Sequence, residues 1–112
     1  MRLYTVQMAK GRGDADLLDI TVKGNHPVGK FFAPTWKMVN EVKKGIISIE
    51  HYSELYRCMM VLSYYNNKQV WHDVLTRKRV VLACFCPSGD FCHRNLLAGY
   101  LMKCGAIYKG EL

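Results

Sequence analysis

The segment RVVLACFC, residues 79–86, is apolar after its first residue and contains two adjacent valines. Such a continuous apolar run is typical of a strand buried on both faces, as in the middle of a parallel sheet, because a half-exposed strand would alternate. Parallel strands also need long crossover connections, which are usually helices. This run alone therefore predicts an α/β fold.

The rest of the chain supplies strands and helices in alternation. Apolar periodicity and turn residues predict further strands at 2–9, 17–22 and 106–109, and helices at 36–45, 48–66, 69–76 and from 91 or 92 to 104. Ser48 is the expected N-cap of the longest helix, and Gly105 ends the last one. With no repeat or linker, residues 1–112 should form a single α/β domain, a small, mainly parallel sheet of three to four strands covered by helices.

The charge and cysteine content restrict the partners and the environment. Lys and Arg total 16 against 9 Asp and Glu, and the resulting charge of +7 favours phosphate-bearing partners, either small molecules or nucleic acids. Five cysteines is an odd number, and the chain does not open with a signal-peptide pattern, so we expect reduced thiols in the cytoplasm. The longest apolar run is strand-sized, which predicts no membrane role. The oligomeric state stays open.

The segment CFCPSGDFCHR, residues 84–94, joins the predicted buried strand to the last helix. A helix N-terminus directs unpaired backbone N–H groups and the positive end of its dipole to one point, which attracts anions. Arg94 adds a cationic fork there, which is unfavourable unless a ligand, Asp19 or Asp90 compensates it. We therefore expect an anion- or phosphate-binding pocket. Its expected residues are Asp19, Lys23, Cys84, Cys86, Ser88, Gly89, Cys92, His93 and Arg94.

Cys92 and His93 are the candidate catalytic residues. A thiol at a helix N-terminus beside His and Arg is readily deprotonated and can act as a nucleophile, with the imidazole as acid or base. Phosphatase and rhodanese loops place a Cys six residues before the Arg, where this chain has Ser88, so that pattern is not met. In the alternative, structural interpretation, the cysteines only fill space, and Asp19, His93 and Arg94 form a polar network that fastens the helix to the sheet.

The same segment has a spacing that could hold a metal ion. The pattern C-x-C-x5-C-H offers three thiolates and one imidazole within a short stretch. However, Cys84 and Cys86 on a straight strand would share one face, whereas Cys92 and His93 are neighbours on a helix turn, so shared ligation should be strained. We therefore predict no metal and no cofactor.

The residues of this segment resemble a known family. Leu82-Ala83-Cys84, followed by Cys92-His93-Arg94 and the Leu96-Leu97-Ala98 helix start, is similar to the domain-of-unknown-function 488 family, in which a strand ending in Cys precedes a Cys-His-Arg helix start. The resemblance implies an α/β fold whose motif residues meet at one site. It implies no particular reaction.

A second family element is only partly present. The family has an Asp-x-Arg after an early strand, and here Asp19-Ile20-Thr21 supplies the Asp but has Thr21 in place of the Arg. Lys23 is the nearest residue that could replace that charge. The segment Phe32-Ala33-Pro34-Thr35-Trp36 also resembles a small branch of the family in bacteria and their phages. The expected location is therefore the cytoplasm of a bacterium or of a phage-infected host cell.

Three functions fit these observations. The first is a protein that handles a nucleotide or a nucleic acid, with the helix start and Arg94 on a phosphate and Asp19 on the sugar or base. The second is a noncatalytic phage-type interaction or inhibitor protein that binds a host protein or sequesters a signalling nucleotide. The third is a cysteine-dependent enzyme that uses Cys92 or His93. Enzyme activity is therefore left open by the sequence.

Overall fold

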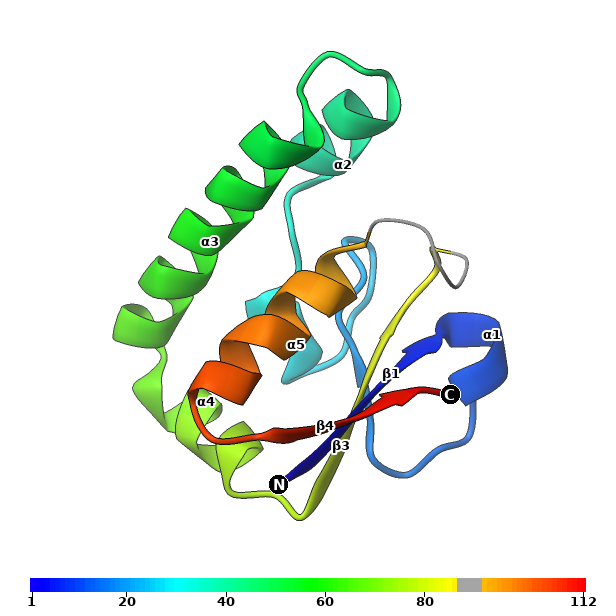
Figure 1. Cartoon of the computed structure of the whole chain (residues 1–112), viewed down its shortest axis with the longest axis vertical. Helices are drawn as coiled ribbons and strands as arrows, with labels where there is room; N and C mark the ends of the chain where they lie inside the picture. The colour runs from blue at the N-terminus through cyan, green and yellow to red at the C-terminus, as the bar shows by residue number, and fades with distance from the viewer. Residues whose placement is uncertain (87–91) are drawn as a thin grey trace.

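The computed structural model describes residues 1–86 and 92–112 and contains a parallel sheet with helices around it (Figure 1). Four strands lie in the order β2-β3-β1-β4, and each adjacent pair is parallel. Their bounds are β1 Arg2–Gln7, β2 Leu17–Asp19, β3 Arg79–Cys84 and β4 Ile107–Glu111. The predicted small α/β fold is confirmed, and the run at 79–86 supplies an interior strand as expected.

The helices are α1 Met8–Gly11, the 3-10 helix η1 Gly29–Phe32, α2 Trp36–Lys43, α3 Ile49–Asn66, α4 Lys68–Leu75 and α5 His93–Lys103. The four longer helices follow the predicted order, whereas the short helices α1 and η1 were not predicted. The Ser48 side chain accepts a hydrogen bond from the His51 N–H, which confirms the predicted N-cap of α3. Gly105 follows α5 with a φ of 105°, a left-handed conformation that favours glycine. No helix in residues 1–86 and 92–112 is long and apolar enough to cross a membrane.

The burial of β3 explains its continuous apolar sequence. Val80 and Leu82 belong to the main core, which lies between the sheet and α3, α4 and α5, and Val81 and Ala83 belong to a smaller cluster on the opposite face. Met8 of α1 packs into that smaller cluster. Both faces of β3 therefore exclude water, which removes the alternation that a half-exposed strand would show.

Three predicted strands end earlier than expected. The chain leaves β1 after Gln7 and forms α1, and it leaves β3 after Cys84. Strand β2 stops at Asp19, whose carboxylate accepts hydrogen bonds from the backbone N–H and the hydroxyl of Thr21 at 2.9 and 2.6 Å. This side-chain contact turns the chain away from the sheet, because it offers the backbone a local alternative to strand pairing.

Candidate functional site

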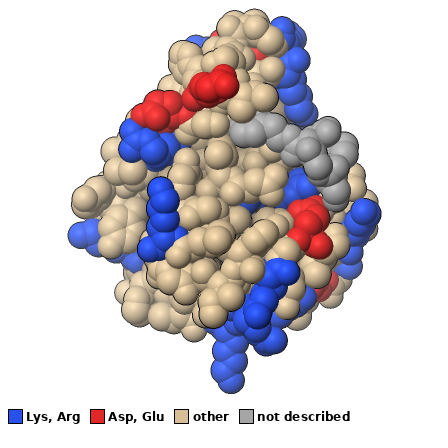
Figure 2. All heavy atoms as spheres, in the orientation of Figure 1, with Lys and Arg blue, Asp and Glu red and all other residues tan. Residues whose placement is uncertain are grey.

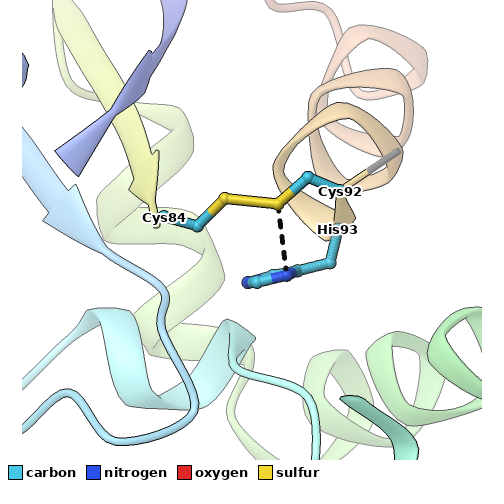
Figure 3. A group of neighbouring side chains, drawn as sticks. All are labelled: Cys84, Cys92 and His93. Atoms are coloured by element: carbon cyan, nitrogen blue, oxygen red, sulfur yellow. Dashed lines mark hydrogen bonds between the residues drawn. A yellow bond between two sulfur atoms is a disulfide. The ribbon is translucent and has the colours of Figure 1, made fainter. Parts of the chain in front are cut away.

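The end of β3 and the start of α5 bring three sequence-predicted residues together (Figure 3). Cys84 is the last residue of β3, Cys92 precedes α5 as its N-cap, and His93 is the first helical residue. The sulfur atoms of Cys84 and Cys92 form a disulfide, with the two Cα atoms 7.8 Å apart. This bond corrects the expectation that all the thiols are reduced, while Cys58, Cys86 and Cys104 are free. Cys84, Cys92 and His93 lie at the carboxyl end of the parallel strand β3, the edge of the sheet at which α/β proteins bind ligands.

Three of the four residues whose shared ligation was expected to be strained, Cys84, Cys92 and His93, lie close together, and the absence of a metal stays a prediction. One sulfur or nitrogen atom from each of the three side chains lies within 4.8 Å of the others. That expectation assumed that Cys84 and Cys86 lie on one straight strand and that both belong to the ligand set. In fact β3 ends at Cys84, so its side chain meets the first residues of α5.

His93 is held in one orientation by a buried hydrogen bond. Its Nε2 lies 2.7 Å from the backbone carbonyl of Ile20, and Nδ1 lies 3.6 Å from Cys92 Sγ. A carbonyl can only accept, so Nε2 carries the proton and Nδ1 presents its lone pair to the sulfur. The pKa of His93 is lowered from 6.5 to about 4, mainly by burial and also by the Arg94 charge, against the opposing effects of the Ile20 carbonyl and Asp19. The imidazole is therefore neutral at physiological pH.

The depressed pKa of His93 predicts a loss of stability in acid. The unfolded imidazole takes up a proton near pH 6.5, but the folded one does so only near pH 4, so the unfolded state binds more protons between these values. The free energy of unfolding should stay constant above pH 7 and fall between pH 6.5 and 4 by up to about 3 kcal/mol. Urea denaturation of the protein with the Cys84–Cys92 disulfide intact measures the free energy of unfolding at each pH. His93→Gln keeps a donor for Ile20 and should flatten the profile, and an unchanged slope would contradict the assignment.

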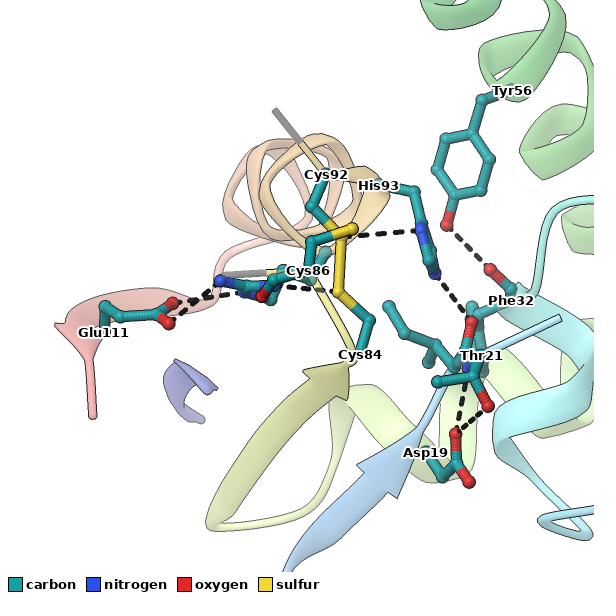
Figure 4. The surroundings of a disulfide bond; sticks show 11 residues. Asp19, Thr21, Phe32, Tyr56, Cys84, Cys86, Cys92, His93 and Glu111 are labelled. Carbon is teal, nitrogen blue, oxygen red and sulfur yellow. Dashed lines mark hydrogen bonds and ion pairs between the residues drawn. A yellow bond between two sulfur atoms is a disulfide. The ribbon is translucent and has the colours of Figure 1, made fainter. Parts of the chain in front are cut away.

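Arg94 lies on the other side of the helix start from His93 and is almost fully buried, at 1% exposure. Its Nη1 donates to Cys84 Sγ at 2.8 Å and to the Cys86 carbonyl at 2.9 Å. Its Nε and Nη2 donate to the two carboxylate oxygens of Glu111 at 3.2 and 3.0 Å (Figure 4). Glu111 in β4 thus supplies a compensating charge for Arg94, which the sequence analysis expected from Asp19, Asp90 or a ligand, and Asp90 lies outside the described residues.

The other residues predicted for the anion-binding pocket do not lie together at one site. Asp19 caps the turn after β2 through Thr21, and Arg94 does not line the pocket described below. Asp19 thus bonds within its own turn, and Arg94 bonds to β4 and to residues 84 and 86. These contacts do not link the two side chains into the expected network, and their role in ligand binding stays a prediction. Ser88 and Gly89 lie outside the described residues.

A pocket of about 230 Å³ opens beside the three clustered side chains. Its walls are residues 21–23, one face of α2, Tyr52 of α3, residues 84–86 and residues 92–93. It therefore contains five of the predicted site residues, which are Lys23, Cys84, Cys86, Cys92 and His93. The sulfur and imidazole groups form one part of a surface that is otherwise mainly apolar.

The side of the pocket formed by α2 was missed by the sequence analysis. Trp36, Val39, Val42 and Lys43 line it, and Trp36 is 55% exposed. The Lys23 ammonium lies 4.6 Å from the centre of the Trp36 ring, so a cation and an aromatic surface lie together at the wall. The helical spacing of these residues was visible, but it predicts a buried helix face equally well and so carries no sign of a pocket.

Together the sheet and the pocket define a class of protein: a parallel α/β domain with a ligand-sized cavity at the carboxyl ends of its strands. The sequence profile of DUF488-N3a, described as "Active DUF488-N3 subclade", matches residues 3–105, so the chain belongs to the DUF488 family. The predicted membership of the family is thereby confirmed, while the Cys-His-Arg motif and the assignment to a bacterial or phage branch stay predictions. No curated protein and no solved structure matches the chain significantly.

Proposed function

We propose that this protein binds a nucleotide, free or at an accessible position of a nucleic acid, with the base in the pocket and the phosphate at Lys23 and Lys43. The observation that carries the proposal is the combination, in one cavity, of an exposed Trp36 ring, apolar side chains and two lysines. An aromatic and apolar surface suits a base, and ammonium groups at its edge suit a phosphate.

The size of the pocket favours a single ring system over a larger ligand. Its volume of about 230 Å³ is below the roughly 300–1,000 Å³ of most drug-sized sites. Lys and Arg side chains on the face drawn in Figure 2 lie in separate groups with uncharged surface between them. The described part of this face therefore carries no continuous basic track of the kind that binds a long phosphate backbone, which supports recognition of one nucleotide at a time there.

Fluorescence titration tests the proposal. Mononucleotides and short single-stranded oligonucleotides should change the emission of Trp36, and Trp36→Phe, which leaves the buried Trp71, should abolish the change. Lys23→Gln or Lys43→Gln should weaken mononucleotide binding about tenfold, roughly 1.4 kcal/mol, and leave nucleoside binding almost unchanged. Lys109→Gln is the matched control, because Lys109 is exposed and does not line the pocket.

Two outcomes would contradict the proposal. One is that neither mononucleotides nor oligonucleotides change the emission of Trp36 in the reduced or the oxidised protein. The other is that the Lys23 and Lys43 variants bind as tightly as the Lys109 variant, since the phosphate would then lie elsewhere.

A cysteine-dependent reaction is the second candidate. It is favoured by the lone pair of His93 Nδ1, which lies 3.6 Å from Cys92 Sγ and could accept a hydrogen bond from the thiol when the disulfide is reduced. The description of the matched subclade as active agrees with it. Alkylation of reduced Cys92 by iodoacetamide well below pH 8.5, the ordinary thiol pKa being about 8.5, would support an activated thiolate. The interaction-protein alternative, including a host-protein partner, stays a prediction.

A further inference from the structure

We infer that Cys84, Cys92 and His93 form a zinc site when the two thiols are reduced, with one coordination position open to the pocket. Two thiolates and one imidazole are the protein ligands of one class of catalytic zinc site, in which the fourth position takes water or substrate. The inference goes beyond the proposed nucleotide binding and rests on different residues, because none of these three is needed to place Trp36, Lys23 or Lys43.

The distances fit a tetrahedral ion. With Zn–S and Zn–N bonds of about 2.3 and 2.0–2.1 Å, a sulfur and a nitrogen on one zinc lie about 3.6 Å apart, and two sulfurs about 3.8 Å apart. The distance from His93 Nδ1 to Cys92 Sγ is 3.6 Å, and all three donor atoms lie within 4.8 Å of one another. The two sulfurs must separate for an ion to lie between them, which reduction of their bond allows (Figure 3).

The backbone spacing also suits an intervening ion. The Cα atoms of Cys84 and Cys92 are 7.8 Å apart, whereas directly bonded cysteines usually have Cα atoms about 4.4–6.8 Å apart. A metal between two thiolates accommodates a wider backbone separation than a direct bond does. The position of β3 relative to α5 is therefore compatible with ligation without moving either element closer.

The groups around the three ligands prepare them for a metal. The Ile20 carbonyl accepts from His93 Nε2 at 2.7 Å, so Nδ1 is the free nitrogen and the ring is fixed in the ligating orientation. Arg94 Nη1 donates to Cys84 Sγ at 2.8 Å, which stabilises the thiolate over the thiol. Hydrogen bonds of this kind to a second shell of protein groups are common around residues that bind metals.

The redox step balances with a dithiol reductant. The reductant gives two electrons and two protons to the Cys84–Cys92 bond and becomes a disulfide itself. Zn²⁺ then displaces the two thiol protons and binds the two thiolates and the neutral His93, giving a site with no net charge. In the reverse step a disulfide oxidant takes two electrons from the two thiolates and two protons from solvent, becoming a dithiol, while Cys84 and Cys92 form their bond; this removes two of the three ligands and releases the ion.

Metal binding to the reduced full chain tests the inference. We expect one equivalent of Zn²⁺ per chain by elemental analysis after dialysis, and Co²⁺ in its place should give the intense thiolate charge-transfer and tetrahedral d–d absorption bands. Cys84→Ser, Cys92→Ser and His93→Gln should each lose stoichiometric binding. Cys86→Ser and Cys58→Ser are the matched controls, since both thiols are free and neither belongs to the cluster, and they should keep it.

A measurement on the unaltered chain covers the case in which a variant fails to fold. Zn²⁺ should protect Cys84 and Cys92, but not Cys58, from alkylation, as read by mass spectrometry of peptides. The inference is overturned if the reduced protein takes up neither ion, if Zn²⁺ protects neither cysteine, or if Cys86→Ser loses the metal as Cys92→Ser does. Nucleotide binding by Trp36 fluorescence, measured with and without a chelator, is a separate result, so either idea can fail alone.

Discussion

Replacing Arg94 with methionine should lower the free energy of unfolding by about 3 kcal/mol, at the lower end of the 3–5 kcal/mol typical of a broken buried ion pair. Arg94 is 1% exposed, and methionine fills much of its volume but supplies none of its donors. The Glu111 carboxylate and the Cys86 carbonyl would lose those hydrogen bonds. Because the Glu111 side chain is 28% exposed and can turn to water, we expect the lower value. Urea denaturation at pH 7 measures the change.

A double-mutant cycle separates the ion pair from simple packing. Glu111→Gln keeps an acceptor for the guanidinium and should cost about 1–2 kcal/mol, with a coupling energy to Arg94→Met above about 1 kcal/mol. A loss below 1 kcal/mol for Arg94→Met, or effects of the two changes that simply add, would show that this contact does not hold β4 to α5. The same contact keeps Arg94 out of the pocket, so nucleotide affinity should change little in a folded variant.

Gly29→Ala should cost more than about 3 kcal/mol or prevent folding. A Cβ at Gly29 would lie 1.9 Å from the carbonyl oxygen of Asp19 and 2.7 Å from its carbonyl carbon. These are backbone atoms at the end of β2, so no side-chain rotation relieves the overlap, and either η1 or β2 must move. The cavity wall formed by residues 21–23 follows directly after β2, so a folded Gly29→Ala protein should also bind nucleotide more weakly. Thermal and urea unfolding measure the stability.

Gly99→Ala is the matched control for the glycine change. Gly99 lies inside α5, and a Cβ there would meet nothing within 4 Å. Alanine is favoured over glycine inside a helix by about 1 kcal/mol, so this variant should be more stable than the natural protein. If Gly29→Ala unfolds at the same urea concentration as the natural chain, the close approach of η1 to β2 is not present in solution.

The local sequence determined the secondary structure and the fold class. The apolar run at 79–86 predicted a strand buried on both faces, and β3 has this environment because α3, α4 and α5 cover one side and Met8 the other. Ser48 and Gly105 marked helix ends because the capping contact and the left-handed turn involve only neighbouring residues. The strand ends were predicted less accurately. At the end of β2 the Asp19 carboxylate accepts from the Thr21 N–H, and this contact competes with strand pairing but leaves no sign in the hydrophobic periodicity.

Only the tertiary structure decided which side chains meet. The sequence placed Cys92, His93 and Arg94 on one helix start, but the packing directs His93 towards Ile20 and the pocket, and Arg94 towards Glu111 (Figure 4). The pocket wall from α2 and the Arg94 partner in β4 come from distant parts of the chain. Periodicity reports that a residue is buried or exposed, whereas its partner depends on strand order and helix placement, which long-range packing sets.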